Sequence, residues 1–266
     1  MSTNASEFSD LDNSPNPEHW IQMMLQLPEM APAINQIRAL MFAPIKDNQC
    51  TSVLDGGCGP GIVTADMANQ LPEALEVIGL DMSDHMLNYA RDQALPKSVS
   101  FAKGSLCDIP FESNRFDAVR VERVLHHIAD NETAVKELVR VCRPGGVIVA
   151  CEPDVRRIYV HPVTPEDGVV FSRRYSEFMA AGDIAPFLPA MFERAGAHVE
   201  SQTTVSMTFR DLDNLQEGFD SIEELRNTLR EAHHEDDVER LDQAIERHEA
   251  FLDVPMTIVV ARKLAS

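Results

Sequence analysis

Residues 51–64 read Thr-Ser-Val-Leu-Asp-Gly-Gly-Cys-Gly-Pro-Gly-Ile-Val-Thr, and this stretch decides the fold. A short apolar run leads into an acid, Asp55, and three alternating glycines, Gly57, Gly59 and Gly61, and a helical pattern follows. Glycine lets the backbone turn tightly and lets a ligand approach closely, because no Cβ intervenes. The N-terminus of the following helix offers unpaired N–H groups and the positive end of a dipole. The stretch therefore predicts a nucleotide-type binding loop between a strand and a helix.

The spacing of these glycines is not that of a dinucleotide site. A dinucleotide fingerprint has a third small residue three places after its second glycine. That place holds Ile62 when the count starts from Gly57 and Gly59, and Thr64 when it starts from Gly59 and Gly61. The acid gives a second argument, since a carboxylate at the strand tip repels a pyrophosphate but suits an ammonium group. S-adenosyl-L-methionine (SAM) carries such an ammonium and no phosphate.

Five later segments extend the pattern, namely 77–83, 104–111, 116–119, 125–128 and 143–146. They read Val-Ile-Gly-Leu-Asp-Met-Ser, Gly-Ser-Leu-Cys-Asp-Ile-Pro-Phe, Phe-Asp-Ala-Val, Leu-His-His-Ile and Arg-Pro-Gly-Gly. In order and spacing, the set resembles the class I SAM-dependent methyltransferases, and in particular the small-molecule enzymes of the ubiquinone/menaquinone-biosynthesis type. The resemblance implies SAM as cofactor and a small-molecule acceptor as partner.

From residue 51 onward, apolar strand patterns alternate with helical ones, which is typical of a parallel sheet with crossover helices. We expect strands at 51–55, 76–81, 99–103, 116–121, 146–152, 198–208 and 256–262, and helices at 17–27, 32–42, 61–71, 83–93, 130–142, 186–195, 221–232 and 235–250. The resemblance implies the fold class: an α/β, Rossmann-like seven-stranded sheet in the order 3-2-1-4-5-7-6, with strand 7 antiparallel and helical cap elements.

The domain organisation is expected to be simple. Residues 1–16 are rich in Ser, Asn and Asp and predict a disordered segment, and 17–266 predict a single methyltransferase domain. The helices within 17–42 are expected to act as a lid. The insertion at 209–254, whose helical patterns are acidic, is expected to cap the substrate.

The net charge and the spacing of the cysteines limit the kinds of partner and the cellular compartment that we expect. Lys and Arg total 23 against 43 Asp and Glu, which gives a formal net charge of −20 and argues against nucleic-acid substrates. The five cysteines form no C-x-x-C pair, so reduced thiols are expected rather than disulfides or zinc. The N-terminus lacks the pattern of a signal peptide, and no apolar run approaches the ~18 residues of a membrane span. We therefore expect a cytoplasmic enzyme without a membrane partner.

Ligands of open α/β sheets bind outside the carboxyl ends of the strands. The loop residues expected to contact the cofactor are Asp55, Gly56, Gly57, Gly59 and Gly61.

Further cofactor contacts are expected at the ends of the next two strands. By resemblance, Asp81 binds the ribose hydroxyls, whereas Ser83 fits the N-cap of the following helix better. Met82 either lies against the adenine ring or belongs to the core. Ser105 stands where relatives commonly carry an acid, which puts a side-chain role there in doubt, and Leu106 keeps a backbone contact to the ring.

The fourth strand carries two charges on one face, Arg120 and Glu122. Buried charges need partners, so a structural pair of Arg120 with Glu122 or with Glu152 is one reading. In the other reading, Glu122 meets the methionine ammonium or orients the acceptor. Arg38 is a candidate for the methionine carboxylate.

Histidines supply the candidate base. His126 and His127 follow the fourth strand directly and titrate in the range that suits proton removal. His233 and His234 lie in a charged helical region and are interpreted as a solvated face, so no metal site is assigned.

Three functions remain open. The first is methyl transfer to an O or N atom of a small organic molecule, such as a secondary metabolite. The second is C-methylation of a quinone-like ring. In the third, the protein uses the SAM fold as a non-transferring enzyme or as a binding subunit.

Overall fold

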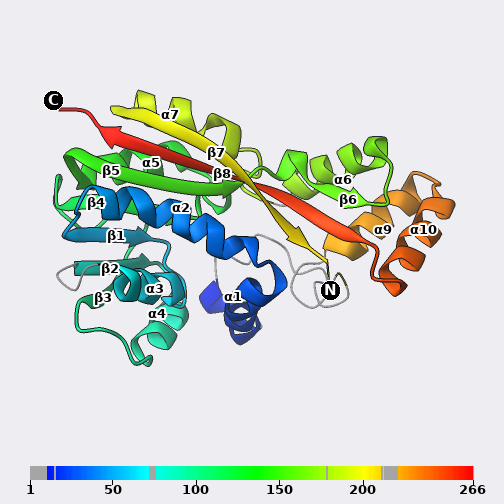
Figure 1. The fold of residues 1–266 in the computed structure, drawn as a ribbon, viewed down its shortest axis with the longest axis horizontal. Helices are drawn as coiled ribbons and strands as arrows, with labels where there is room; N and C mark the ends of the chain where they lie inside the picture. The colour runs from blue at the N-terminus through cyan, green and yellow to red at the C-terminus, as the bar shows by residue number, and fades with distance from the viewer. Residues whose placement is uncertain are drawn as a thin grey trace.

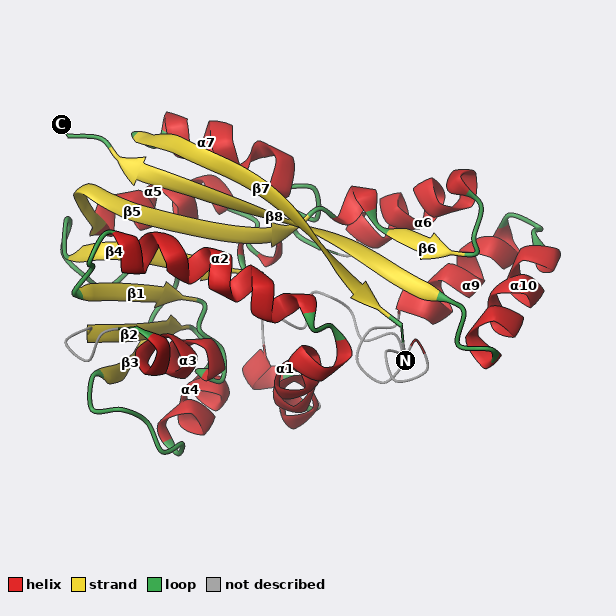
Figure 2. Cartoon of the chain, viewed as in Figure 1, coloured by secondary structure: helices red, strands yellow, loops and turns green. Residues whose placement is uncertain are grey.

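A twisted sheet runs through the protein, and helices cover both of its faces (Figures 1 and 2). The computed structural model describes residues 11–14, 16–71, 76–177, 179–210, 212 and 221–265. Within these residues the strands are β1 (Ser52–Gly56), β2 (Glu76–Asp81), β3 (Val99–Lys103), β4 (Phe116–Glu122), β5 (Cys142–Pro153), β6 (Tyr159–His161), β7 (Ala197–Phe209) and β8 (Phe251–Lys263).

The sheet order confirms the expected topology. The path runs β3-β2-β1-β4-β5-β8, the first five strands are parallel, and β8 is antiparallel to β5, β6 and β7. β7 and β8 are thus strands 6 and 7 of the expected order. The short β6 is an addition that the sequence analysis missed, because three residues are too few to show a strand period.

The helices are α1 (Pro17–Met30), α2 (Ala33–Asp47), α3 (Ile62–Gln70), α4 (Asp84–Arg91), α5 (Asn131–Val141), α6 (Pro165–Glu177), α7 (Leu188–Arg194), α9 (Ser221–Glu231) and α10 (Glu235–Glu246). Short 3-10 turns are η2 (Leu11–Asn13), η3 (Leu125–His127), η4 (Val155–Arg157) and η5 (Ala185–Phe187). Among the described residues, no helix is both long and apolar enough to cross a membrane.

Two apolar layers hold the helices to the sheet. On one face, α2 packs Ile37 and Met41 against strand residues such as Val53 and Val149. On the other face, α5 and α7 pack against the alternate residues of the same strands, such as Val119. The alternation follows from the pleat, which points successive side chains to opposite faces. The helices lie on the two faces of the sheet, and the carboxyl ends of the five parallel strands lie together at one end of it, which we call the carboxyl edge.

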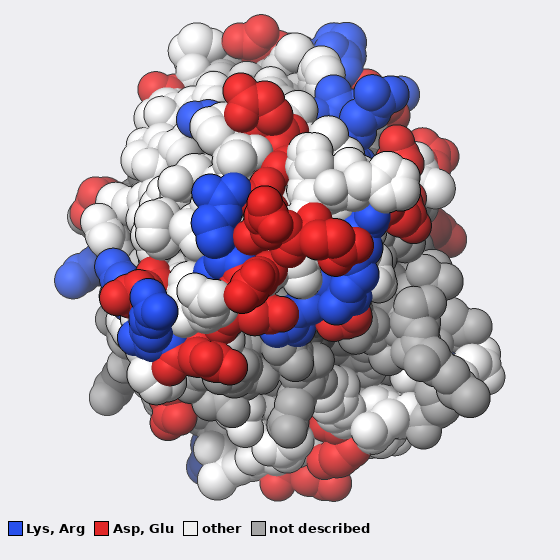
Figure 3. Space-filling view, turned by 90° about the vertical axis from the view of Figure 1, so that its right-hand side faces the viewer, with Lys and Arg blue, Asp and Glu red and all other residues white. Residues whose placement is uncertain are grey.

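The hairpin of β7 and β8 continues past this edge and carries a second group of helices (Figure 1). Leu252 and Val254 of β8 share a core with Phe171 of α6, Leu225 of α9 and Leu241 of α10. We call this group, formed by β6, α6, α9 and α10, the outer lobe. Figure 3 faces this end of the molecule and shows acidic and basic side chains interspersed over it.

Ordered structure starts earlier than residue 17. Leu11 is buried, and the Asp12 carboxylate accepts hydrogen bonds from the hydroxyl of Ser83 at 2.5 Å and from the backbone N–H groups of Asp84 at 2.9 Å and His85 at 3.0 Å. An acid is favoured there because the first N–H groups of a helix lack partners within the helix. The expected disorder of 1–16 therefore does not extend to Leu11–Asn13, while residues 1–10 and 15 lie outside the described residues.

At the opposite edge of the sheet, Asp117 joins β4 to β1. Its Oδ2 accepts hydrogen bonds from Thr51 N at 2.7 Å, Thr51 Oγ1 at 2.8 Å and Ser52 N at 3.2 Å, and Arg143 Nε donates to Oδ1 at 2.5 Å. Burial alone raises the pKa of this carboxyl, but the bonds from Thr51 and Arg143 outweigh it and lower the pKa to about 2.

Asp117→Asn should lower the free energy of unfolding at pH 7 by about 1–3 kcal/mol, because N–H groups of β1 lose a charged acceptor. A carboxyl with a depressed folded-state pKa stabilises above its ordinary value and loses that effect as pH falls. The difference between wild type and variant should therefore be constant above about pH 5 and shrink as the pH falls through 3.8 to about 2. Urea unfolding measures it, with exposed Asp236→Asn as control. Equal stability of the two proteins at pH 7 would contradict the assignment.

Candidate active site

The loop between β1 and α3 folds back onto β2. The N–H groups of Gly57 and Cys58 donate to the carbonyl of Leu80 at 2.7 and 3.0 Å. Gly57, Gly59 and Gly61 have φ values of 67°, 52° and 75°, in the left-handed region that glycine adopts without strain. The loop thereby places the N-terminus of α3 at the carboxyl edge of the sheet.

The three glycines of the loop differ in how closely other atoms approach them. A Cβ on Gly57 would lie 2.4 Å from Val124, in the segment after β4, and a Cβ on Gly61 would lie 2.7 Å from Phe101. At Gly59 the nearest such contact is the sulfur of Met24 in α1, at 3.5 Å. Gly57 and Gly61 thus permit close packing within the protein, whereas a Cβ on Gly59 would make an ordinary van der Waals contact with Met24 of α1.

Asp81 ends β2 beside this loop. Its Oδ2 accepts from Gly59 N at 2.8 Å and its Oδ1 from Ser83 N at 3.0 Å. Burial raises the pKa of Asp81, and these hydrogen bonds oppose the rise. Ser83 caps α4 as expected, since its hydroxyl accepts from Met86 N at 3.1 Å. Met82 is 55% exposed, so its side chain is available on the surface next to Asp81.

The segment after β3 forms a tight turn. The Ser105 hydroxyl accepts from Cys107 N at 3.1 Å and is used within the turn. Leu106 is buried, and its Cδ2 would lie 2.9 Å from a Cβ on Gly56. Gly56 therefore has a packing role that the sequence analysis did not separate from cofactor contact.

A buried ion network joins β1 to β4 beneath α2. Asp55 is in register with Arg120, and Arg120 Nη1 donates to Asp55 Oδ1 at 2.5 Å. Arg120 Nη2 donates to Oε2 of Glu122, and Thr64 of α3 donates to Asp55 Oδ2 at 2.7 Å. Of the two pairings considered, Arg120 thus takes Glu122. The alternative with Glu152 is wrong, because the pleat directs Glu152 to the other face of the sheet.

Four buried atoms in or next to this network have no hydrogen-bond partner among the described residues. They are Oε1 of Glu122, an acceptor, and the Nε atoms of Arg38, Arg120 and Arg123, which are donors. Oε1 of Glu122 and Nε of Arg123 lie 3.5 Å apart as an ion pair. The Arg38 side chain is 7% exposed and reaches only Asp66, at 3.4 Å from its Nη1. Burial, followed by the charges of Arg123 and Arg120, lowers the pKa of Arg38 to about 10. The sequence analysis expected Asp55 to meet an ammonium group. Both oxygens of Asp55 already accept hydrogen bonds, whereas Oε1 of Glu122 accepts none among the described residues.

His126 lies on the opposite face of the sheet. Its Nδ1 is 2.5 Å from Oε2 of Glu152, whose Oε1 accepts from the backbone N–H groups of Val124 at 3.0 Å and Leu125 at 2.8 Å. Because an ionised carboxylate only accepts, the ring proton belongs on Nδ1, and Nε2 is left as the acceptor of the neutral ring. Glu152 therefore orients His126, a role that the sequence analysis missed, since strand register cannot be read from the chain.

His127 has a different environment. Its ring centroid is 3.8 Å from that of His126. Burial, followed by the charges of His126 and Arg123, lowers the pKa of His127 well below its ordinary value. The geometry thus brings both candidate bases together, and His126 has a carboxylate partner, Glu152, that can stabilise an imidazolium.

The outer lobe brings His234 to two acids. Its Nδ1 is 2.8 Å from Asp167 and 3.9 Å from Asp237. These three side chains lie close enough together to be considered as metal ligands. Arg240 contacts Asp237, and Thr164 donates to Asp167 at 2.8 Å, so protein groups already serve both carboxylates.

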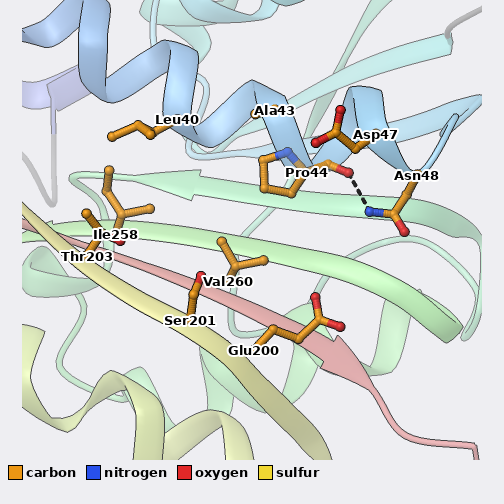
Figure 4. A pocket seen from close by; sticks show the side chains of 10 residues that line it. All are labelled: Leu40, Ala43, Pro44, Asp47, Asn48, Glu200, Ser201, Thr203, Ile258 and Val260. Atoms are coloured by element: carbon orange, nitrogen blue, oxygen red, sulfur yellow. Dashed lines mark hydrogen bonds between the residues drawn. The ribbon is translucent and has the colours of Figure 1, made fainter.

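A groove of about 320 Å³ lies elsewhere, between α2 and the β7–β8 hairpin (Figure 4). Its lining includes Leu40, Pro44, Glu200, Ser201 and Val260. No residue expected to bind the cofactor lines this groove, so the site at the carboxyl edge is separate from it.

Gly57→Ala should destabilise the protein by about 2–4 kcal/mol, because the added methyl group meets Val124 and the residue has a positive φ. Gly145→Ala is a matched control, since Gly145 has a φ of 72° and no atom within 4 Å of an added Cβ. The control should cost only about 1 kcal/mol. Thermal or urea unfolding gives both values, and equal losses would show that the contact with Val124 is relaxed.

Comparisons with known proteins identify the family and the fold of this chain. Residues 54–150 match the methyltransferase domain family. A demethylmenaquinone methyltransferase of Bacillus cereus is 30% identical over 164 residues, covering 55% of this chain and 69% of the relative. An uncharacterised 37.1 kDa protein in a transposon of Streptomyces fradiae is 31% identical, covering 67% and 52%, so the chain spans about half of that relative. The YcgJ structure from Bacillus subtilis has a TM-score of 0.63 at 18% identity, covering 87% and 100%. This chain belongs to the class I SAM-dependent methyltransferases, in the group that resembles the quinone-biosynthesis enzymes.

Proposed function

We propose that this protein transfers a methyl group from SAM to an oxygen or nitrogen atom of a small organic molecule. The observation that carries the proposal is that Oε1 of Glu122 and Nε of Arg38 are buried and have no hydrogen-bond partner among the described residues. Such an acceptor and such a donor suit the ammonium and the carboxylate of an amino-acid tail. Buried polar groups without partners are costly, so a zwitterionic ligand would relieve both.

The remaining residues fit the rest of the cofactor. Asp81 would hold the ribose hydroxyls, and the exposed Met82 would lie against the adenine. The turn at Ser105 and Leu106 would supply a backbone N–H to the adenine ring. Gly59 has no side chain, so the cofactor could approach the backbone of the loop there. Asp55 would act through Arg120, since its carboxylate already accepts two hydrogen bonds.

The cofactor supplies a methyl group bound to a sulfonium. After transfer of the methyl group, the sulfur departs as a neutral thioether. The protein therefore has no oxyanion to stabilise in the leaving group, and its work is to align the acceptor, exclude water and remove a proton where needed. Nε2 of His126 is the acceptor for that proton. Glu152 stabilises the imidazolium that results.

A second candidate function is C-methylation of a quinol ring. It is favoured by the relatives named as demethylmenaquinone methyltransferases. A non-transferring role is a third candidate, because the [4+2]-cyclase SpnF has a related fold, with a TM-score of 0.52 at 19% identity. Three further expectations belong to the same proposal: a location in the cytoplasm, a lid formed by the helices within 17–42, and a substrate cap formed by the insertion at 209–254. Residues 211 and 213–220 of that insertion lie outside the described residues.

Calorimetry should show micromolar binding of S-adenosylhomocysteine and SAM, and none of NAD. Asp81→Ala should weaken that binding by at least ~1.5 kcal/mol, because two ribose hydroxyls lose a charged partner. The control is Asp92→Ala, at an exposed aspartate after α4. Unchanged affinity in Asp81→Ala would move the ribose elsewhere, and binding of NAD instead would overturn the cofactor assignment.

His126→Gln should keep the affinity for SAM and lower turnover by about 10²-fold or more. Glu152→Gln should lower turnover in the same direction and change its pH profile, because the imidazolium loses its carboxylate. Transfer of labelled methyl from SAM to demethylmenaquinol, catechols and amines measures the effect and separates the target atoms. Full activity in variants of both His126 and His127 would leave catalysis to alignment alone.

A further inference from the structure

The strand β7 forms an edge of the sheet. It pairs with β8 on one side, and no strand within the described part of the chain pairs with its other side. In an antiparallel ladder, alternate residues aim their N–H and C=O groups at the neighbouring strand, and the residues between them aim these groups away from it. The free side of β7 therefore presents a row of backbone donors and acceptors to which another strand can add.

The middle of β7 is exposed on both faces. A bulge shifts the register with β8 between Val199 and Ser201. Beyond this bulge, Ser201 and Thr203 line the groove beside α2 (Figure 4), and the pleat points Gln202 and Thr204 to the other face. The side chains of all four residues after the bulge are exposed. This part of the strand is therefore accessible to another strand.

The edge at β7 lacks the features that keep edge strands apart. Such edges are usually short, carry lysine or proline, or are bent by a bulge. The opposite edge of the sheet follows this rule, because β3 has five residues and ends at Lys103. In contrast, β7 has 13 residues, and its stretch 201–209, which lies beyond the bulge, contains neither a charged residue nor a proline. The stretch is thus open to pairing.

A second copy of this chain fits the uncharged edge. Two identical strands that run antiparallel are related by a two-fold axis, so the same strand serves both copies. Each copy carries a formal net charge of −20, so two copies repel each other over most of their surfaces. At 201–209 they can meet without like charges facing each other. The charge next to this stretch, Glu200, is paired within its own copy, with Arg262 Nε at 2.6 Å from its Oε1.

We propose that two copies form a dimer in which the free sides of their β7 strands pair antiparallel, with the two-fold axis at Thr203. This residue is the middle of 200–206, a stretch that is exposed except for the half-buried Val205. In this register Thr203 faces Thr203 of the second copy, and Ser201 faces Val205 of the second copy. Threonine pairs across strands are favourable. The two sheets become one continuous sheet.

The dimer does not depend on the proposed function, because no residue of the candidate active site lies in β7. The carboxyl edge of each copy keeps its own cofactor loop and its own candidate base. The proposal therefore concerns the assembly of the enzyme, and calorimetry with S-adenosylhomocysteine tests the cofactor site separately.

Sedimentation velocity of the full chain, at concentrations from about 1 to 100 µM, tests the proposal. Wild type should sediment as a dimer at the upper end of this range. Thr203→Lys and Thr203→Glu should each weaken the association at least about tenfold, because the axis places two like charges opposite each other. An equimolar mixture of the two variants should associate again, because opposite charges then face each other. Gln70→Lys adds the same charge at an exposed position of α3 and should leave the dimer unchanged.

Three outcomes would overturn the proposal. In the first, wild type stays monomeric over the whole range. In the second, wild type forms a dimer that neither variant of Thr203 weakens, so the copies meet at another surface. In the third, both variants weaken the dimer but their mixture does not restore it, which shows damage to the strand rather than repulsion across an axis. Circular dichroism of each variant checks that it is folded.

Discussion

The bridge that Arg120 makes between Asp55 and Glu122 is the interaction on which the rest of the site depends. It ties the tip of β1 to the tip of β4 on a buried face, where either carboxylate alone would be costly. Because Arg120 takes one oxygen of Glu122, the other has no hydrogen-bond partner among the described residues and lies 3.5 Å from Nε of Arg123. Burial of the network under α2 also explains why Phe42 lies 5.9 Å from the guanidinium carbon, as an apolar cover.

The two faces of the sheet divide the chemistry between them. The face beneath α2 holds the charges that suit a zwitterion, while the opposite face holds His126 and Glu152, which suit proton transfer. Both groups meet at the segment after β4, where Val124 packs against Gly57 and Arg123 turns back toward Glu122. One short segment thus connects the cofactor loop with the candidate base.

The sequence alone predicts most of this fold, because its glycines, strand periods and the turn at 143–146 are local signals. The strand order was predicted from the resemblance to a family, since local pattern does not define the neighbours of a strand, and the structure confirms it. The partners of Glu152 were beyond reach for the same reason, as they depend on the register between β4 and β5. Arg123 was missed because alternation predicts the wrong face for it, and a positive φ on arginine has no sequence signature.

The contact of Asp12 with the first turn of α4 has a consequence for cofactor exchange. Leu11, Trp20, Ile21, Met23 and Met86 form an apolar cluster of their own, separate from the two layers of the sheet. Such a cluster can open as a local unit at a free energy below that of global unfolding. If the Asp12 carboxylate left the first turn of α4 and this cluster opened, the cofactor loop would be uncovered. All the hydrogen bonds between the strands of the sheet would stay in place. The rate of product exchange would then be set by the stability of that small unit rather than by the stability of the whole protein.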